Sequence, residues 1–285
     1  MFGEFSLTIC AVYLIKRRTT SESERVFLIS YLKNIIFYKD LLGNLTSNEM
    51  KLKYKNSILG ILWSYIYPLM MIVIYNFAFK IILRMTIDNF ALFVFIGLIP
   101  WNFVQASISQ STNSIINNQN LVKKIYFPRA IIPLSVINAN FITMIISHII
   151  LFGAMFVYHV DFTASLLILP ILWIILYLVV AGISLVLSSI TVKYRDVSHI
   201  VDVVFMAWFY LTPVIYSLSM VPEPFNKIIQ LNPITNLIEL FREVLLEGKF
   251  PDLINILFTL GYAVVLFAVG LFIFYKREKN FGEEL

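Results

Sequence analysis

The chain has 285 residues, of which 59% are hydrophobic and only 14% are charged, and its mean hydropathy is +0.83. This composition excludes a soluble or disordered protein and supplies enough apolar residues for about six membrane-spanning helices of about 20 residues each. The formal net charge of +5 would favour nucleic acid as the partner of a soluble chain, but in a membrane protein it is typical of cytoplasmic loops, so we expect no nucleic-acid partner. One cysteine and three widely separated histidines exclude an internal disulfide and indicate neither redox chemistry nor a metal site.

Two segments precede the first candidate span. Residues 1–25 form an N-terminal extension to which we assign no role. Residues 26–57 mix apolar residues with Lys33, Lys39 and Asp40, which predicts an amphipathic helical region lying on the membrane surface. A solvated basic helix is the alternative interpretation.

Six long apolar segments follow and predict transmembrane helices at residues 59–80, 90–115, 130–158, 165–190, 200–216 and 253–275. If these spans alternate in direction, 11 of the flanking Lys and Arg residues fall on one side of the membrane and 5 on the other. The positive-inside rule therefore places both termini in the cytoplasm. We expect one all-α integral membrane domain over residues 58–285, with six transmembrane helices.

The connection between the fifth and sixth spans, residues 217–252, carries its own helix signals. Asn232 suits an N-cap, Pro233 suits the first helical position, and Gly248 suits the position after a helix end. Between them lies one apolar stripe, made of Leu237, Ile238, Phe241, Val244 and Leu245. This pattern predicts two short helices that form a re-entrant hairpin on the non-cytoplasmic side.

The chain lacks the residues that would power transport or catalyse a reaction. The spans are nearly free of charge, which argues against an ion-coupled carrier, and His148 alone in the third span is typical of a hydrogen-bonded packing residue. No Gly-x-x-x-x-Gly-Lys-Ser/Thr loop is present to bind a nucleotide. We therefore expect no catalytic residue and no cofactor in this chain, and a partner must supply energy for any uphill transport.

The spans are instead rich in aromatic and uncharged polar side chains. Asn140, Thr143 and Ser147 form one polar stripe at helical spacing. Because ring faces stack on sugar rings and amides bond to hydroxyls, this composition favours a path for a carbohydrate polymer. Helix packing and interfacial aromatic belts are the alternative. The candidate path residues are Trp63, Tyr67, Tyr75, Phe205, Trp208, Phe209, Gln105 and Asn140.

The connection between the second and third spans predicts a short cytoplasmic helix that is ended by Pro128 and docks on a motor protein. Its apolar face, made of Leu121, Val122, Ile125 and Tyr126, favours a partner over a solvated basic loop, which is the alternative. The candidate coupling residues are Asn120, Leu121, Val122, Lys123, Lys124, Ile125 and Tyr126.

Six segments in the same order carry a family resemblance. They are Lys53-Tyr54-Lys55-Asn56-Ser57-Ile58-Leu59-Gly60 with Leu62-Trp63 and Pro68; Gly97-Leu98-Ile99-Pro100-Trp101; Asn120-Leu121-Val122-Lys123-Lys124 with Phe127-Pro128; Tyr194-Arg195-Asp196-Val197; Leu211-Thr212-Pro213-Val214-Ile215-Tyr216; and Leu231-Asn232-Pro233. Together they resemble the ABC-2 type permeases that export O-antigen, teichoic acid and capsular polysaccharides. The resemblance runs from about residue 30 to the C-terminus.

This resemblance implies a homodimer of six-span subunits in a bacterial cytoplasmic membrane. Two copies of a separate ATPase subunit, which binds ATP and Mg²⁺, would join it to move a glycan linked to undecaprenyl pyrophosphate outward. The resemblance also implies that residues 120–127 are the coupling helix, that the first and fifth spans line the channel, and that residues 217–248 are re-entrant exit helices.

Five cations sit in the sequence where a lipid pyrophosphate would approach from the cytoplasm, and we take them as its candidate landing site: Lys51, Lys53, Lys55, Arg129 and Arg195. Topology signals and contacts with anionic membrane lipids are the alternative for these residues. Three rival functions stay open: an ABC-2 permease for a drug or small lipid, an ATP-independent flippase, and a membrane enzyme acting on a lipid-linked sugar. The last would need paired carboxylates, whereas Asp88, Asp161 and Glu223 are scattered.

Overall fold

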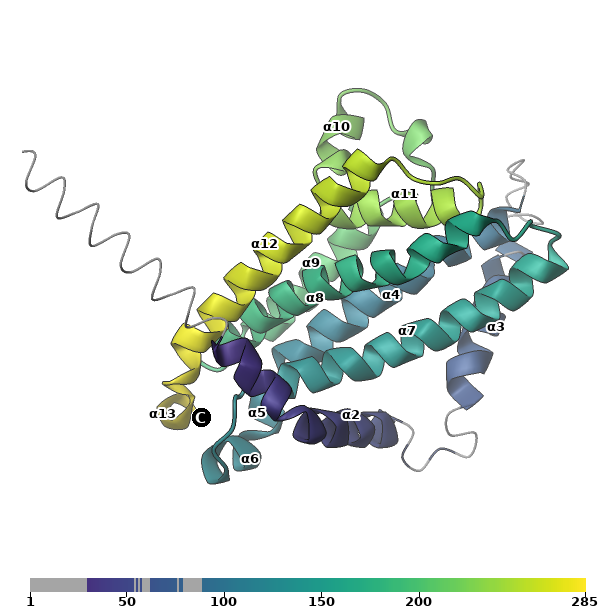
Figure 1. Ribbon diagram of the computed structural model, residues 1–285. Helices are drawn as coiled ribbons and strands as arrows, with labels where there is room; N and C mark the ends of the chain where they lie inside the picture. Colours follow the sequence, from purple (N-terminus) through teal and green to yellow (C-terminus); the bar gives the residue numbers. More distant parts are fainter. Residues whose placement is uncertain (1–29, 54, 56, 58–61, 76, 79–88) are drawn as a thin grey trace, which may run out of the picture.

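The computed structural model describes residues 30–53, 55, 57, 62–75, 77–78 and 89–285, apart from the side chains of Ser64 and Tyr75 (Figure 1). The N-terminal extension, both ends of the first predicted span and most of the loop that follows it lie outside these residues. All secondary structure in the described ranges is helical. The elements are α2 (Lys39–Lys53), α3 (Trp63–Tyr75), α4 (Phe90–Thr112), α5 (Ser114–Asn117), α6 (Gln119–Lys124), α7 (Ile131–Val157), η3 (Ala164–Ile168), α8 (Leu169–Thr191), α9 (Val197–Leu211), η4 (Leu218–Met220), α10 (Phe225–Gln230), α11 (Pro233–Leu245), α12 (Leu253–Glu278) and α13 (Phe281–Glu284).

Four helices are long and apolar enough to cross a membrane: α4, α7, α8 continued from η3, and α12. They agree with the second, third, fourth and sixth predicted spans to within a few residues. In α4, 83% of the apolar 18-residue stretch is buried inside the molecule. The corresponding shares are 33% in α7, 44% in α8 with η3, and 28% in α12. Helix α4 is therefore the centre of the bundle, and α3, α7, α8, α9 and α11 pack around it.

The fifth predicted span forms a slightly shorter helix than the sequence indicated, and the first predicted span is described only in part. Helix α3 has 13 described residues and α9 has 15, so at 1.5 Å per residue they extend roughly 20 Å and 23 Å, less than the hydrocarbon core of about 30 Å. Helix α9 ends at Leu211 because Thr212 precedes a proline and takes an extended conformation. The described residues thus contain four helices that are long enough to span a membrane and two shorter apolar helices, and these six lie at the positions of the six predicted spans.

The two ends of the bundle carry different elements (Figure 1). Helix α2 lies across one end, where α5, α6 and α13 also lie, and α10 and α11 lie at the other. Because α4, α8 and α12 run toward the α2 end and α7 and α9 start from it, the chain alternates in direction as the sequence analysis expected. The basic connections around Lys123, Lys193 and Lys279 consequently gather at the α2 end.

Helices α8 and α12 make the closest helix pair, and two glycines permit it. A Cβ on Gly270 would lie 2.2 Å from the carbonyl oxygen of Gly182, and a Cβ on Gly182 would lie 2.6 Å from that of Leu266. Without side chains at these two positions, the backbones touch directly, which is a common way for helices to associate in a membrane.

Helix α11 follows the predicted pattern closely. The Asn232 side chain caps it by accepting a hydrogen bond of 3.1 Å from the Ile234 N–H, and Gly248 follows its end with a φ of +63°. All five residues of the predicted apolar stripe are at most 1% exposed. The helix packs this face on α4 and α8, so it is a fixed part of the bundle.

Candidate functional site

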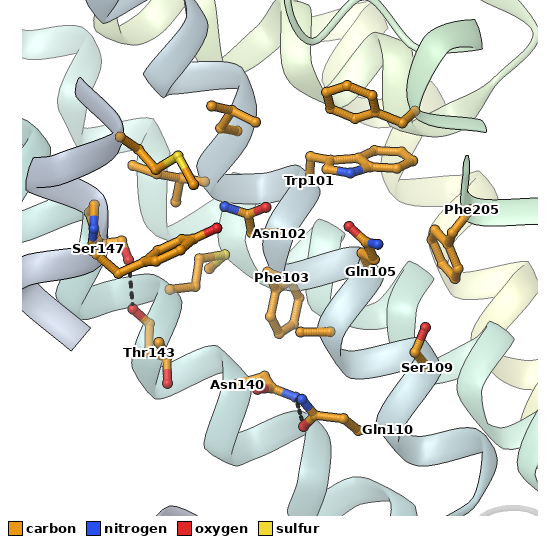
Figure 2. Close-up of a pocket in the computed structure, with 18 of the residues that line it drawn as sticks. Trp101, Asn102, Phe103, Gln105, Ser109, Gln110, Asn140, Thr143, Ser147 and Phe205 are labelled. Atoms are coloured by element: carbon orange, nitrogen blue, oxygen red, sulfur yellow. Dashed lines mark hydrogen bonds between the residues drawn. The ribbon is translucent and has the colours of Figure 1, made fainter. Parts of the chain in front are cut away.

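A cavity of about 1080 Å³ opens beside the central helix, and it gathers residues from five parts of the chain. Its walls come from the end of α2, from α3, from the middle of α4, from α7 and from α9. The apolar residues of α4 that face away from the cavity anchor this wall in the core. Side chains of opposite character, polar and aromatic, project into the space (Figure 2).

The polar side of the cavity is built on α4 and α7. Asn102, Gln105 and Ser109 follow one face of α4 at helical spacing, and Figure 2 shows the Asn102 and Gln105 amides pointing into the cavity. On α7, Asn140 donates through Nδ2 to Gln110 Oε1 at 3.0 Å, while Thr143 and Ser147 bond to the backbone one turn earlier. Among the described residues, no side chain bonds to the amides of Asn102 or Gln105. These two groups are therefore available to a ligand.

The aromatic side of the cavity centres on Trp101, which is only 1% exposed. Its ring centroid lies 5.9 Å from Phe205, 6.1 Å from Trp208 and 5.6 Å from Phe209, with edge or tilted geometry. Phe205 and Trp208 in turn stack on each other at 5.5 Å. These contacts fix α9 against α4 and set the ring surfaces that border the cavity (Figure 2).

Two charged side chains, Lys53 and Asp202, line the cavity. Lys53, the last residue of α2, directs Nζ toward Asn140 Oδ1 at 3.4 Å and toward Thr143 Oγ1 at 3.3 Å. Partial burial lowers the pKa of the Lys53 ammonium, and a bound anion would offset that cost. On α9, the Asp202 carboxylate accepts a long hydrogen bond of 3.5 Å from Ser109 Oγ. In the described ranges, no group of three His, Cys, Asp or Glu side chains is placed to hold a metal ion.

Six of the eight candidate path residues line this one cavity, namely Trp63, Tyr67, Gln105, Asn140, Phe205 and Phe209. Trp208 does not line the cavity, but its ring packs against the rings of Trp101 and Phe205, which do. The side chain of Tyr75 lies outside the described part. Trp101 was not among the candidate path residues, although it lies one helical turn before Gln105 on α4. Asp202 was not among them either, although it stands three residues before Phe205 and hence on the same face of α9.

The five candidate landing cations have different surroundings in the structure. Lys53 lines the cavity, while Lys51, Lys55 and Arg195 are exposed outside its lining. Arg129 lies at the end of α12, where its guanidinium donates to the backbone carbonyl of Glu278 and its N–H donates to Glu278 Oε2 at 3.2 Å. Arg129 thus has a partner within the chain that the sequence could not indicate, because the two residues are 149 positions apart.

The candidate coupling segment forms a helix that is shorter than predicted. Helix α6 ends at Lys124, and Ile125 takes an extended conformation, so Ile125 and Tyr126 do not share a helical face with Leu121 and Val122. Val122 is buried, Leu121 is half-buried, and Asn120, Lys123 and Lys124 are exposed. Tyr126 is 95% exposed and Ile125 55% exposed, so an apolar surface is available, but it lies on the extended chain after the helix.

His148 has the packing role that the sequence indicated. It is 1% exposed, Nδ1 lies 3.0 Å from the Met144 carbonyl, and the Trp173 indole N–H points to Nε2 at 3.5 Å. A neutral ring that donates through Nδ1 and accepts through Nε2 satisfies both contacts.

Comparison with known proteins indicates the family to which this chain belongs. A family model described as ABC-2 type transporter matches residues 40–246. The O-antigen export system permease protein RfbA of Klebsiella pneumoniae is 35% identical over 254 residues, which are 88% of this chain and 97% of the relative. RfbA of Myxococcus xanthus is 28% identical over 260 residues, 90% of this chain and 100% of the relative.

A more distant relative is named for a different cargo. The polysialic acid transport protein KpsM of Escherichia coli is 23% identical over 238 residues, 81% of this chain and 91% of the relative. The family model covers more than half of the chain, and the match to RfbA of Klebsiella pneumoniae spans nearly the full length of both proteins. The chain therefore belongs to the ABC-2 type transporter family.

Proposed function

We propose that the chain is the permease subunit of an ATP-driven ABC exporter that moves a polysaccharide, linked to a lipid pyrophosphate, across the bacterial cytoplasmic membrane. The observation that carries the proposal is the cavity itself, in which rings such as those of Tyr67 and Phe209 border the same space as the unpaired amides of Asn102 and Gln105. Ring faces suit the apolar faces of sugars and amides suit their hydroxyls, while the scarcity of charge avoids strong ionic binding of the passing polymer. The names of the relatives, which export O-antigen or transport polysialic acid, agree with this cargo.

Two kinds of partner, an ATPase subunit and a second copy of this chain, complete the proposed exporter. The sequence has no nucleotide-binding loop, so a separate pair of ATPase subunits supplies the energy, with α6 and its exposed Lys123 and Lys124 as the docking point. A second copy of this chain closes the cavity, because wall residues such as Met206 and Tyr210 are 73% and 70% exposed in one copy. Both termini face the cytoplasm in this arrangement, since the basic connections gather at the α2 end of the bundle.

Export in the native cell tests the cargo. Deletion of the chain is expected to remove the surface polysaccharide and to leave lipid-linked polymer inside, and the full-length chain is expected to restore the surface polymer. Surface polymer that persists unchanged in the deletion strain contradicts the proposal and favours a permease for a drug or small lipid.

Copurification tests the energy source. The tagged chain is expected to bring down a stoichiometric P-loop ATPase from mild detergent, and Lys123→Glu with Lys124→Glu is expected to release it, because the reversal replaces two exposed cations of α6. Lys193→Glu with Lys279→Glu is the matched control, since it changes two exposed cations at the same end of the bundle by the same total charge. If the chain purifies without any ATPase, the result favours an ATP-independent flippase. If both double variants lose the ATPase equally, the proposed role of α6 is wrong.

A further inference from the structure

The cavity holds one cation and one anion among its described lining residues, and the structure keeps them on different sides of α4. Lys53 is held on the α7 side by Asn140 and Thr143, and Asp202 is held on the α9 side by Ser109. Figure 2 shows Thr143 on one side of the Asn102 and Gln105 amides and Ser109 with Phe205 on the other. No ion pair joins Lys53 to Asp202 in the described part of the chain.

A band of hydrogen-bonding side chains lines the cavity between the two charges. From Lys53 it passes to Asn140, then to Gln110 on α4, whose neighbour in sequence is Ser109, the donor to Asp202. A ligand that lies along this band meets a positive charge first, then amides and hydroxyls, and a carboxylate last. The matching chemistry is an anionic group joined to a group rich in hydroxyl donors.

The surroundings of Asp202 favour a sugar ring at its end of the band. Phe205 and Phe209 follow on the same face of α9 and line the same cavity, so ring faces stand next to the carboxylate. An ionised carboxylate only accepts hydrogen bonds, and the single described donor to Asp202 is Ser109 at the long distance of 3.5 Å. Most of its acceptor capacity is thus free for sugar hydroxyls, whereas a second phosphate there would be repelled.

Resting on the proposed function, we infer that this band recognises the junction between phosphate and sugar in the lipid-linked glycan. Lys53 binds the phosphate group, and Asp202, positioned by Ser109, accepts hydrogen bonds from the hydroxyls of the adjoining sugar while Phe205 borders that sugar. Asp202 is then a specificity residue that admits a glycosylated lipid phosphate in preference to the bare lipid phosphate.

Binding to the full-length chain, purified with its ATPase subunit in nanodiscs, tests this inference with two probes: farnesyl diphosphate and the same lipid carrying N-acetylglucosamine on its diphosphate. Lys53→Gln is expected to weaken both probes about tenfold or more, the loss typical of a charge-assisted hydrogen bond. Asp202→Asn is expected to weaken only the sugar-bearing probe by a similar factor and to leave farnesyl diphosphate unchanged or tighter. Ser109→Ala, which removes one hydroxyl, is expected to give a smaller loss with the same selectivity.

Matched controls and the remaining outcomes separate this inference from its alternatives. Lys33→Gln and Asp40→Asn remove exposed charges outside the cavity and are expected to bind like the unaltered complex. Equal effects of Asp202→Asn on both probes, or none, overturn the role of Asp202 while the proposed function stands. Recovery of binding in the exchanged pair Lys53→Asp with Asp202→Lys also overturns it, because two charges that merely balance each other tolerate exchange. If the unaltered complex binds neither probe, the proposed cargo fails as well.

Discussion

The guanidinium of Arg242 lies over the ring of Phe93, with its central carbon 3.7 Å from the ring centroid. The same guanidinium donates to Glu239 Oε1 at 2.7 Å and to the Val214 carbonyl at 2.8 Å. One side chain thereby joins α11 to the first turn of α4 and to the segment that follows α9. Because α4 and α9 form two walls of the cavity, Arg242 fixes the geometry of those walls from outside the cavity.

Arg242→Gln is expected to destabilise the protein by about 1–3 kcal/mol, since it removes the charged donor of the buried Val214 carbonyl and the ion pair with the half-exposed Glu239. Arg242→Lys is expected to recover little, because an ammonium cannot reach Glu239 and Val214 together and stack on Phe93. The measurement is the apparent melting temperature in mild detergent. Lys227→Gln is the control, because its 3.9 Å ion pair with Glu223 is exposed and contributes little. Equal melting temperatures for the two Gln variants would show that Arg242 has no structural role.

The glycine contact between α8 and α12 makes a second prediction. Gly270→Ala is expected to cost about 1–3 kcal/mol, because its Cβ would overlap the Gly182 backbone and push the two helices apart. Gly261→Ala, on the same helix, has no atom within 4 Å of its new Cβ, so it is expected to be neutral or to gain about 0.5–1 kcal/mol of helix propensity. Unfolding monitored by gel filtration after heating compares the two variants. A Gly270→Ala protein as stable as Gly261→Ala contradicts the close contact.

The long apolar runs and the caps were predictable from the sequence, and the reasons are local. Helices α4, α7, α8 and α12 each contain about 20 or more consecutive, predominantly apolar residues, and Asn232 with Pro233 specifies the start of α11 through bonds to its immediate neighbours. The candidate path also came together, because aromatic and amide residues on single helical faces turn toward one shared cavity.

What the sequence could not predict depends on contacts between distant segments. Arg242 looked like a cation flanking a span, but it is 3% exposed because Phe93 and Val214 reach it from 149 and 28 residues away in the chain. Trp101 gave no sign of being the centre of the aromatic cluster, since its partners lie on α9. Helix α6 was predicted too long because Ile125 and Tyr126 continue an apolar pattern that the extended backbone interrupts.

Substitutions of two tyrosines on α3 distinguish a role in transport from a role in stability. Tyr67 lines the cavity and is 51% exposed, while Tyr65 lies outside the lining and is 37% exposed. Tyr67→Leu is expected to lower surface polysaccharide several-fold without changing the melting temperature, because an exposed ring contributes little to packing but offers a face to a passing sugar. Tyr65→Leu, the same change two residues away, is expected to leave export intact. Equal export by the two variants would remove α3 from the proposed path.

Glu278 joins three segments at the α2 end of the bundle. Its Oε2 accepts hydrogen bonds from the Tyr31 hydroxyl at 2.6 Å and from the Arg129 N–H at 3.2 Å, and the Tyr31 ring packs edge-on against Tyr275 at 5.2 Å. Burial and the charge of Glu278 raise the pKa of Tyr31, so its hydroxyl stays protonated and remains a donor. The helical residues 30–37 are therefore attached to the end of α12 and to the segment that follows α6.

Glu278→Ala is expected to release residues 30–37, with amide hydrogen exchange there rising about tenfold or more, because two bonds to a charged acceptor worth about 1.5–3 kcal/mol each are lost. Glu278→Gln keeps an oxygen acceptor but no charge and is expected to fall between Ala and the unaltered chain. Tyr31→Phe removes one of the two donors and is expected to give part of the same increase. Glu283→Ala changes an exposed carboxylate five residues later and is expected to leave exchange in residues 30–37 unaltered. Exchange that rises equally in the Glu278 and Glu283 variants would mean that the loss of negative charge near the C-terminus, and not the bond to Tyr31, controls this segment.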